Sequence, residues 1–158
     1  MKLDEILSSV YPYESIPVDD GYEITFKDSK GDFVVVTFEL WAGPESFEVS
    51  FTRDGKYNMT KGGDELRIFA TVLKIMTDFL REHKPKFISF AASKEEESRV
   101  TFYKRLIRKF IPGTNYIEVT DDTDKIDHDV APHWFRNRKN MFKTSDHMIV
   151  ARKDMLKD

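Results

Sequence analysis

Hydrophobic and polar residues alternate along three consecutive runs in the N-terminal third of the chain, which is the pattern of β-strands. The run 45–53 places Phe47, Val49 and Phe51 on one face and polar residues between them. The run before it, 32–41, is apolar on both faces, as expected of an interior strand. Short SKG and AGP turns join the runs. We therefore predict a three-strand antiparallel meander over 22–28, 32–41 and 45–53.

The hydrophobic period then changes to three and four residues, which predicts an amphipathic helix from Gly63 to His83. Pro85 ends this helix, and the short apolar run 86–93 predicts a buried strand. Because strand, helix and strand form a crossover unit, we expect 86–93 to run parallel to the third strand of the meander. The helix has a wide apolar stripe, which suits a broadly buried element. It comprises Leu66, Ile68, Phe69, Val72, Leu73, Ile75, Met76, Phe79 and Leu80.

A second helix is predicted after Ser93, which has Glu96 three residues later in the arrangement of a capping box. Pro112 and Gly113 end this helix. Its apolar stripe comprises Val100, Tyr103, Leu106, Ile107 and Phe110. The remaining elements expected are a short amphipathic helix over 2–9 and strands over 115–119 and 147–152.

This order predicts an α+β fold in which a long central helix and a second helix pack against a mixed, mainly antiparallel sheet. The chain has 158 residues, the size of one ordinary domain, so we expect a single domain over 1–158.

Composition excludes several functional classes. The formal net charge is −3, so no overall field attracts nucleic acid or an acidic membrane. The chain contains no cysteine, which removes disulfides, thiolate metal ligands and a cysteine nucleophile. No apolar run approaches the roughly 18 residues that cross a bilayer. We expect a cytoplasmic protein with neither a membrane nor a nucleic acid as its main partner.

The element order, with TKGGDE at 60–65 and SRVTFYKRLIRKF at 98–110, resembles the GCN5-related N-acetyltransferase (GNAT) fold. In that family a meander is followed by a glycine-bearing phosphate loop, a long central helix, a strand and a helix with an F-Y-x-x-L-like pattern. Here Phe102 to Leu106 is similar to that pattern. The segment 67–106 also resembles small proteins of tailed bacteriophages, which suggests a phage-encoded, divergent member.

The resemblance implies that acetyl-CoA is the cofactor and that Lys61, Gly62 and Gly63 hold its pyrophosphate. The physical basis is sound, because glycines and a helix N-terminus present free N–H groups to an anion. Two departures weaken the match: the glycines are adjacent, and Asp64 and Glu65 follow them. Carboxylates in the first turn of a helix interact favourably with the helix dipole and so compete with a phosphate for that end of the helix. A purely structural interpretation, with the glycines in a turn and Asp64 as the cap, stays open.

Tyr103 occupies the position at which the resemblance implies a general acid that protonates the departing thiolate. It also lies on the apolar stripe of its helix, so core packing is the alternative. Glu48, on the polar face of its strand, is the candidate base for an amine acceptor, with Glu39 as second choice. Members of the family carry a strand and two helices before the meander, whereas here we expect a short helix and a proline-containing segment.

Residues 120–146 form the least regular stretch, acidic in its first half and basic-aromatic in its second. The acidic half lacks the spacing of a calcium loop and His128 and His133 lack that of a zinc site, so we predict no metal. The basic-aromatic part, 133–143, could hold a protein partner or stack on bases, or fold back on the sheet. Its candidate partner-binding residues are Trp134, Phe135, Arg136 and Arg138.

Two functions follow from the sequence. The first is an acyl-CoA-dependent N-acetyltransferase that acts on a small-molecule or protein amine. The second is a GNAT-like scaffold without catalysis that binds a host or virion protein through 133–143. A fold hosts unrelated functions, so the fold alone does not choose between them.

Overall fold

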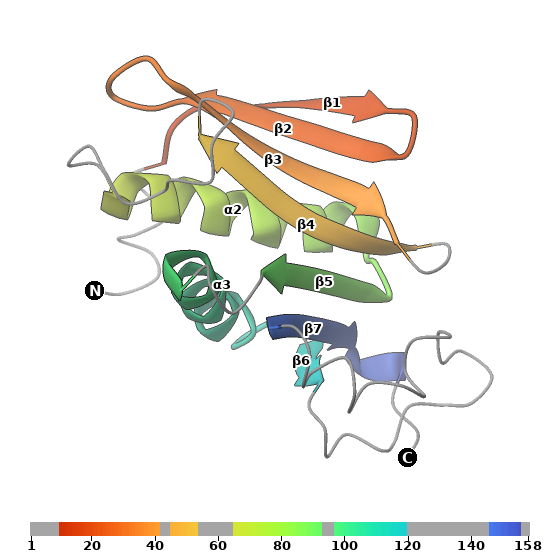
Figure 1. Cartoon of the computed structure of the whole chain (residues 1–158). Helices are drawn as coiled ribbons and strands as arrows, with labels where there is room; N and C mark the ends of the chain where they lie inside the picture. Colours follow the sequence, from red (N-terminus) through yellow and green to blue (C-terminus); the bar gives the residue numbers. More distant parts are fainter. Residues whose placement is uncertain (1–9, 42–44, 54–64, 93–96, 120–145, 156–158) are drawn as a thin grey trace.

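The computed structural model describes residues 10–41, 45–53, 65–92, 97–119 and 146–155 (Figure 1). Seven strands form one sheet in the order β1-β2-β3-β4-β5-β7-β6. Two helices, α2 (Glu65–His83) and α3 (Glu97–Phe110), and a short 3₁₀ turn, η2 (Lys153–Met155), complete the described elements. The strands are β1 (Glu14–Val18), β2 (Gly21–Lys27), β3 (Phe33–Leu40), β4 (Ser46–Arg53), β5 (Phe87–Ala92), β6 (Tyr116–Val119) and β7 (Asp146–Arg152).

The sheet is mixed and mainly antiparallel, as the sequence predicted. Strands β1 to β4 form an antiparallel meander, and β7 pairs antiparallel with both β5 and β6. The exception is β4 with β5, which are parallel because α2 crosses between them. The predicted α+β class, the mainly antiparallel sheet and the parallel pair are therefore confirmed.

Strand β1 was not predicted, and its presence corrects the expectation of a three-strand meander preceded only by a helix and a proline-containing segment. Its five residues are all exposed, so they show no alternation of burial to reveal a strand. Pro17 also argues against a strand in the sequence, since proline cannot donate a ladder hydrogen bond. Here β1 is the edge of the sheet and Pro17 faces Tyr22, a place where proline is tolerated. The helix expected over 2–9 lies outside the described residues.

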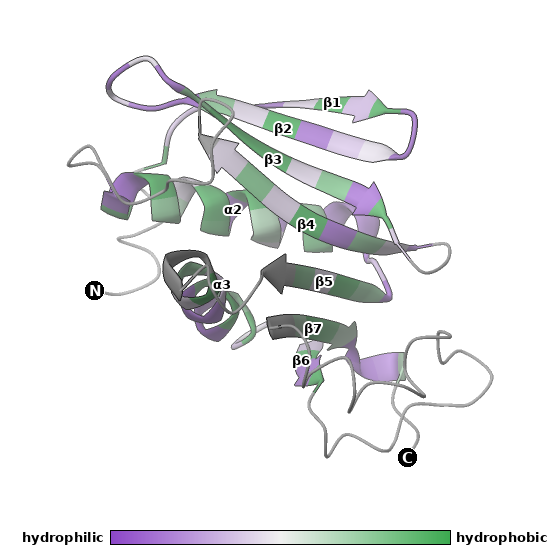
Figure 2. Ribbon diagram, viewed as in Figure 1, coloured by the Kyte–Doolittle hydropathy of each residue, from purple (hydrophilic) through white to green (hydrophobic). Residues whose placement is uncertain are grey.

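The core lies between one face of the sheet and the two helices (Figure 1, Figure 2). Phe38 of β3 stacks on Phe79 of α2 with ring centroids 3.7 Å apart, and Phe47 of β4 meets Phe79 edge-on. All but one of the predicted α2 stripe residues are buried. The exception is Leu66, which is 50% exposed and corrects that part of the prediction. It lies in the first turn of α2, two residues before the first buried residue, Ile68.

Helix α3 packs through the predicted stripe, and every residue of that stripe is buried. Lys104, Arg105, Arg108 and Lys109 are exposed on its other side. The proposed capping pair, Ser93 and Glu96, falls outside the described residues. Neither helix in the described part of the chain is long and apolar enough to span a lipid bilayer.

Candidate functional site

Strands β4 and β5 separate after a short parallel pairing, and we call the opening between them the fork. Within the described strands the pairing runs from Ser46–Phe87 to Val49–Phe90. Strand β4 continues to Arg53 without β5, whereas β5 continues to Ala92 against β7. Figure 1 shows the two strands diverging toward the end of the sheet at which α2 begins. The fork therefore combines unpaired strand backbone with the N-terminal end of a long helix.

Aromatic rings from α3 fill the side of the fork that faces the helices. The Tyr103 ring has no exposed surface and meets Phe51 of β4 at 5.0 Å and Phe90 of β5 at 5.2 Å between centroids. Beside it, Phe102 packs edge-on against Phe51 at 4.7 Å and against Phe69 of α2 at 5.5 Å. Tyr103 thus bridges the last paired residue of β5 and the unpaired part of β4. Its predicted place on the core stripe is confirmed, and its role as an acid stays a prediction.

Helix α2 begins at Glu65, and its N-terminal end, which carries the positive end of the helix dipole, lies on the side of the sheet where the fork opens (Figure 1). The predicted phosphate-binding residues Lys61, Gly62 and Gly63 lie outside the described residues, and their role stays a prediction. Glu65 is exposed in the first turn. Its carboxylate would reduce the attraction of the helix end for a phosphate.

Glu48, the candidate base, is half-buried on the face of the sheet opposite the helices. It lies across from Glu39 of β3 and beside Ser89 of β5 in the strand register. Because neighbouring side chains of a strand alternate between faces, Glu48 and Tyr103 are on opposite sides of the sheet. The structure therefore does not bring these two residues together directly.

The basic-aromatic segment 133–143, with Trp134, Phe135, Arg136 and Arg138, lies outside the described residues, as do the acidic residues before it. Within the described ranges, no three histidine, aspartate or glutamate side chains gather in a group that could hold a metal ion.

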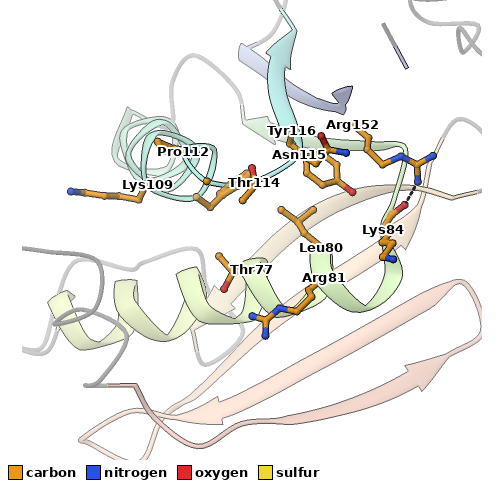
Figure 3. A pocket seen from close by; sticks show the side chains of 12 residues that line it. Thr77, Leu80, Arg81, Lys84, Lys109, Pro112, Thr114, Asn115, Tyr116 and Arg152 are labelled. Atoms are coloured by element: carbon orange, nitrogen blue, oxygen red, sulfur yellow. Dashed lines mark hydrogen bonds between the residues drawn. The ribbon is translucent and has the colours of Figure 1, made fainter. Parts of the chain in front are cut away.

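A pocket at the other end of the helices was missed from the sequence. It has a volume of about 580 Å³ and lies between the C-terminal ends of α2 and α3, the start of β6 and the end of β7 (Figure 3). The only sequence signal was the presence of basic residues in the last turn of each helix. Such residues interact favourably with the helix dipole and do not by themselves indicate a pocket. Which helix ends meet is a property of the packing. The lining residues are Thr77, Leu80, Arg81, Lys84, Lys109, Phe110, Pro112, Gly113, Thr114, Asn115, Tyr116 and Arg152.

Hydrogen bonds fix the wall of this pocket that β6 and β7 provide. The Tyr116 hydroxyl donates to the carbonyl of Pro85 at 2.6 Å, and burial raises the pKa of that hydroxyl above its ordinary value. Arg152 donates from Nε and Nη2 to the two carboxylate oxygens of Asp154 and from Nη1 to the carbonyl of Lys84. The hydrogen bonds from Arg152 lower the pKa of the Asp154 carboxyl.

Residues 8–130 match the family described as "Family of unknown function (DUF6934)", and the chain belongs to that family. No curated protein matches the sequence. Among solved structures, the chain is similar to a phenylalanine-to-alanine mutant of spermidine N-acetyltransferase SpeG from Vibrio cholerae, with a TM-score of 0.45 and 9% identity over 85% of this chain and 67% of that chain. A chimera of SpeG from Vibrio cholerae and hSSAT gives a TM-score of 0.39 and 9% identity over 86% of this chain and 69% of that one.

Proposed function

We propose that this protein binds an acyl-CoA thioester at the fork between β4 and β5 and transfers the acyl group to an amine. The observation that supports the proposal is the position of Tyr103. Its ring meets Phe51 of β4 and Phe90 of β5, so it contacts both strands where they separate.

The fork suits an extended ligand for a backbone reason. Peptide groups of β4 beyond Val49 have no β5 partner in the described strands, so a linear amide-containing chain could take the place of the missing strand. The N-terminus of α2 lies at the same end and favours an anionic group there. The sequence-predicted Lys61, Gly62 and Gly63 immediately precede that helix and are the proposed phosphate holders.

In this proposal, bound acyl-CoA supplies the activated acyl group. Tyr103 donates the hydroxyl proton to the sulfur as the carbon–sulfur bond breaks, and Glu48 accepts the proton that the amine loses as the carbon–nitrogen bond forms. The two side chains act from opposite faces of the sheet, so the amine must reach the thioester through the fork. For this to occur the aromatic packing around Tyr103 must admit the sulfur, since the ring is fully buried.

The first test is a thermal unfolding titration with acetyl-CoA. A ligand that binds the folded chain raises its stability by mass action, by about 2.7 kcal/mol at a concentration one hundred times its dissociation constant. AMP is the control, because it supplies an adenine nucleotide without the pantetheine chain. No shift at millimolar acetyl-CoA would overturn the proposal and favour the scaffold that binds a protein partner.

The second test measures thiol release from acetyl-CoA in the presence of a panel of amines. The absence of cysteine means that the protein itself adds no background to a thiol-specific dye. Loss of a general acid typically costs about 10²-fold or more in rate, so Tyr103→Phe should lower turnover by at least that factor. Tyr22→Phe is the matched control, since Tyr22 packs on Phe79 away from the fork. Equal turnover in both variants would remove Tyr103 from the mechanism.

A further inference from the structure

We propose that the pocket between the C-terminal ends of α2 and α3 binds a small organic phosphate, with Lys84 and Lys109 as its charge partners. This site is separate from the fork. Phe69 meets Phe102 at the fork, and the first residue of α2 that lines the pocket is Thr77, eight positions further along, which corresponds to a rise of about 12 Å. Phosphate binding at this pocket therefore does not depend on acyl transfer at the fork.

The charged side chains that line the pocket are all basic. Arg81, Lys84, Lys109 and Arg152 line it, and none of its lining residues is acidic. Arg152 is held by both oxygens of Asp154, and Arg81 by one oxygen of Asp78. No hydrogen bond or ion pair joins the ammonium group of Lys84 or Lys109 to another residue of the described chain. Among the described residues, these two cations are therefore left for a ligand with two negative charges.

The helix dipole explains why basic residues occur in the last turn of each helix. It does not explain why a pocket lies between the two helix ends. The pocket has an apolar base formed by the buried side chains of Leu80, Phe110 and Tyr116. In Figure 3 the Lys109 side chain extends outward from the rim, while Leu80 and Tyr116 point into the space. Lysine side chains rotate about four bonds, so an ammonium at the rim can follow an anion. A ligand with an apolar body and an anionic end would place its body on the apolar base of the pocket and its charge beside the lysines at the rim.

Backbone hydrogen bonds hold Lys84 at the edge of the pocket. Its φ angle is 45°, in the left-handed region where helices usually end with glycine or asparagine. Its N–H donates to the carbonyl of Leu80, and its carbonyl accepts from Arg152. Glycine would adopt this conformation without the strain that it imposes on lysine. The hydrogen bond from Arg152 also ties the position of Lys84 to the opposite wall of the pocket.

The test is a titration of the full chain with phenyl phosphate, followed by two-dimensional amide NMR. We expect the amide chemical shifts of Lys84, Thr114, Asn115 and Tyr116 to change and to saturate as phenyl phosphate is added. Inorganic phosphate lacks the apolar body and phenol lacks the charge, so each should bind at least tenfold more weakly. Shifts centred on residues 50–53 or 90–92 would assign the phosphate to the fork instead and overturn the proposal.

Two variants test the charge partners. Lys84→Gly removes the ammonium while favouring the observed backbone conformation, so it should bind phenyl phosphate at least tenfold more weakly and still fold. Lys109→Gln should weaken binding by a similar factor. Lys104→Gln, an exposed lysine of α3 that does not line the pocket, is the control and should bind as the parent does. Unchanged affinity in both Lys84→Gly and Lys109→Gln would refute the assignment.

Discussion

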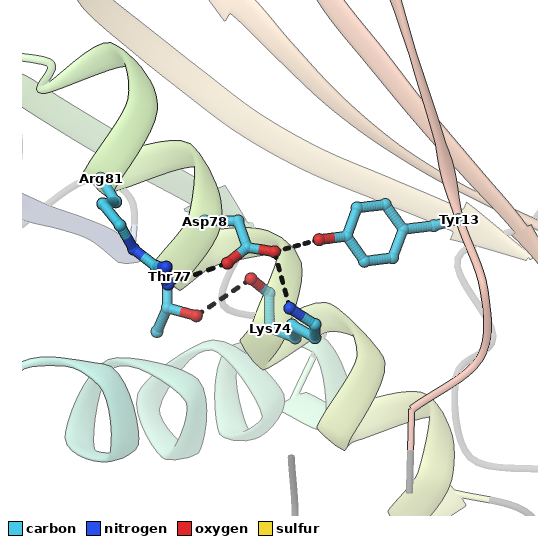
Figure 4. A network of polar contacts seen from close by, with 5 residues as sticks. All are labelled: Tyr13, Lys74, Thr77, Asp78 and Arg81. Carbon is cyan, nitrogen blue, oxygen red and sulfur yellow. Dashed lines mark hydrogen bonds and ion pairs between the residues drawn. The ribbon is translucent and has the colours of Figure 1, made fainter. Parts of the chain in front are cut away.

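The hydroxyl of Tyr13 donates a hydrogen bond to the carboxylate of Asp78, which joins the segment before β1 to the middle of α2 (Figure 4). Asp78 also accepts from Lys74 at 3.0 Å and from Arg81 at 2.9 Å on the same helix. The contact links residues 65 positions apart and anchors the start of the edge strand. The three donors surround a carboxylate whose side chain is 22% exposed.

Removal of the hydroxyl should measure the strength of this link. Tyr13→Phe is expected to lower the free energy of unfolding by about 1 kcal/mol, because a partly exposed hydrogen bond to a charged group is lost. Urea unfolding of Tyr13→Phe, Asp78→Asn and the double variant isolates the pairwise energy. If the two single effects simply add, the contact contributes nothing and the prediction is wrong.

Asp78 should make stability depend on pH in the acid range. Partial burial acts to raise its pKa, but hydrogen bonds from Tyr13 and Lys74 and the charges of Lys74 and Arg81 hold the pKa below the ordinary 3.8. Between the pKa of Asp78 in the folded chain and its pKa in the unfolded chain, the unfolded chain binds a proton that the folded chain does not. The contribution of Asp78 to the free energy of unfolding is therefore complete above the unfolded-state pKa and declines as pH falls through the folded-state pKa.

The measurement is the unfolding free energy of the parent and of Asp78→Asn from about pH 5 to about pH 2. The stability advantage of the parent should shrink as pH falls. Asp19→Asn, which changes an exposed carboxylate in the turn between β1 and β2, is the comparison. An advantage that stays constant with pH would contradict the assigned role of Asp78.

Gly21 should be irreplaceable for a steric reason. Its φ angle is 153°, and a Cβ atom there would lie 1.8 Å from the carbonyl oxygen of Phe38 on the neighbouring strand. Gly21→Ala is expected to destabilise the protein by more than about 3 kcal/mol, because backbone must move. Gly31→Ala is the matched control: its φ is 86° but the space around it is open, so only the conformational cost of about 1 kcal/mol applies. Chemical denaturation followed by circular dichroism distinguishes the two, and equal losses would refute the clash.

Two leucines of α2 should respond differently to the same substitution. Leu73 is fully buried, and Leu73→Ala is expected to cost about 2–5 kcal/mol through lost burial and a cavity. Leu66 is half-exposed, so Leu66→Ala should change stability by less than about 0.5 kcal/mol. Urea unfolding of both variants checks this, and a large loss at Leu66 would show that the core extends to the first turn.

Periodicity revealed the elements whose burial repeats regularly. The alternation at Phe47, Val49 and Phe51 and the three-and-four spacing of α2 and α3 placed most buried residues of β4, α2 and α3 correctly, because such patterns record which side of an element is buried. Phe102, which is also buried, was left out of the predicted stripe of α3. The same method missed β1, whose residues are all exposed and include Pro17. It also assigned Leu66 to the core, since a stripe shows the buried side of a helix but not where along the helix burial stops.

For the candidate sites, the sequence by itself supplied Tyr103 on a helix stripe and the basic last turns of α2 and α3. Only the tertiary structure decided that Tyr103 meets Phe51 and Phe90 where two strands part, and that Lys84 and Lys109 stand at one pocket. The physical reason is that hydrophobic spacing is a local property, read within a few turns of chain. The fork and the pocket depend on where strand pairing ends and which helix ends meet, and these are set by packing between residues far apart in sequence.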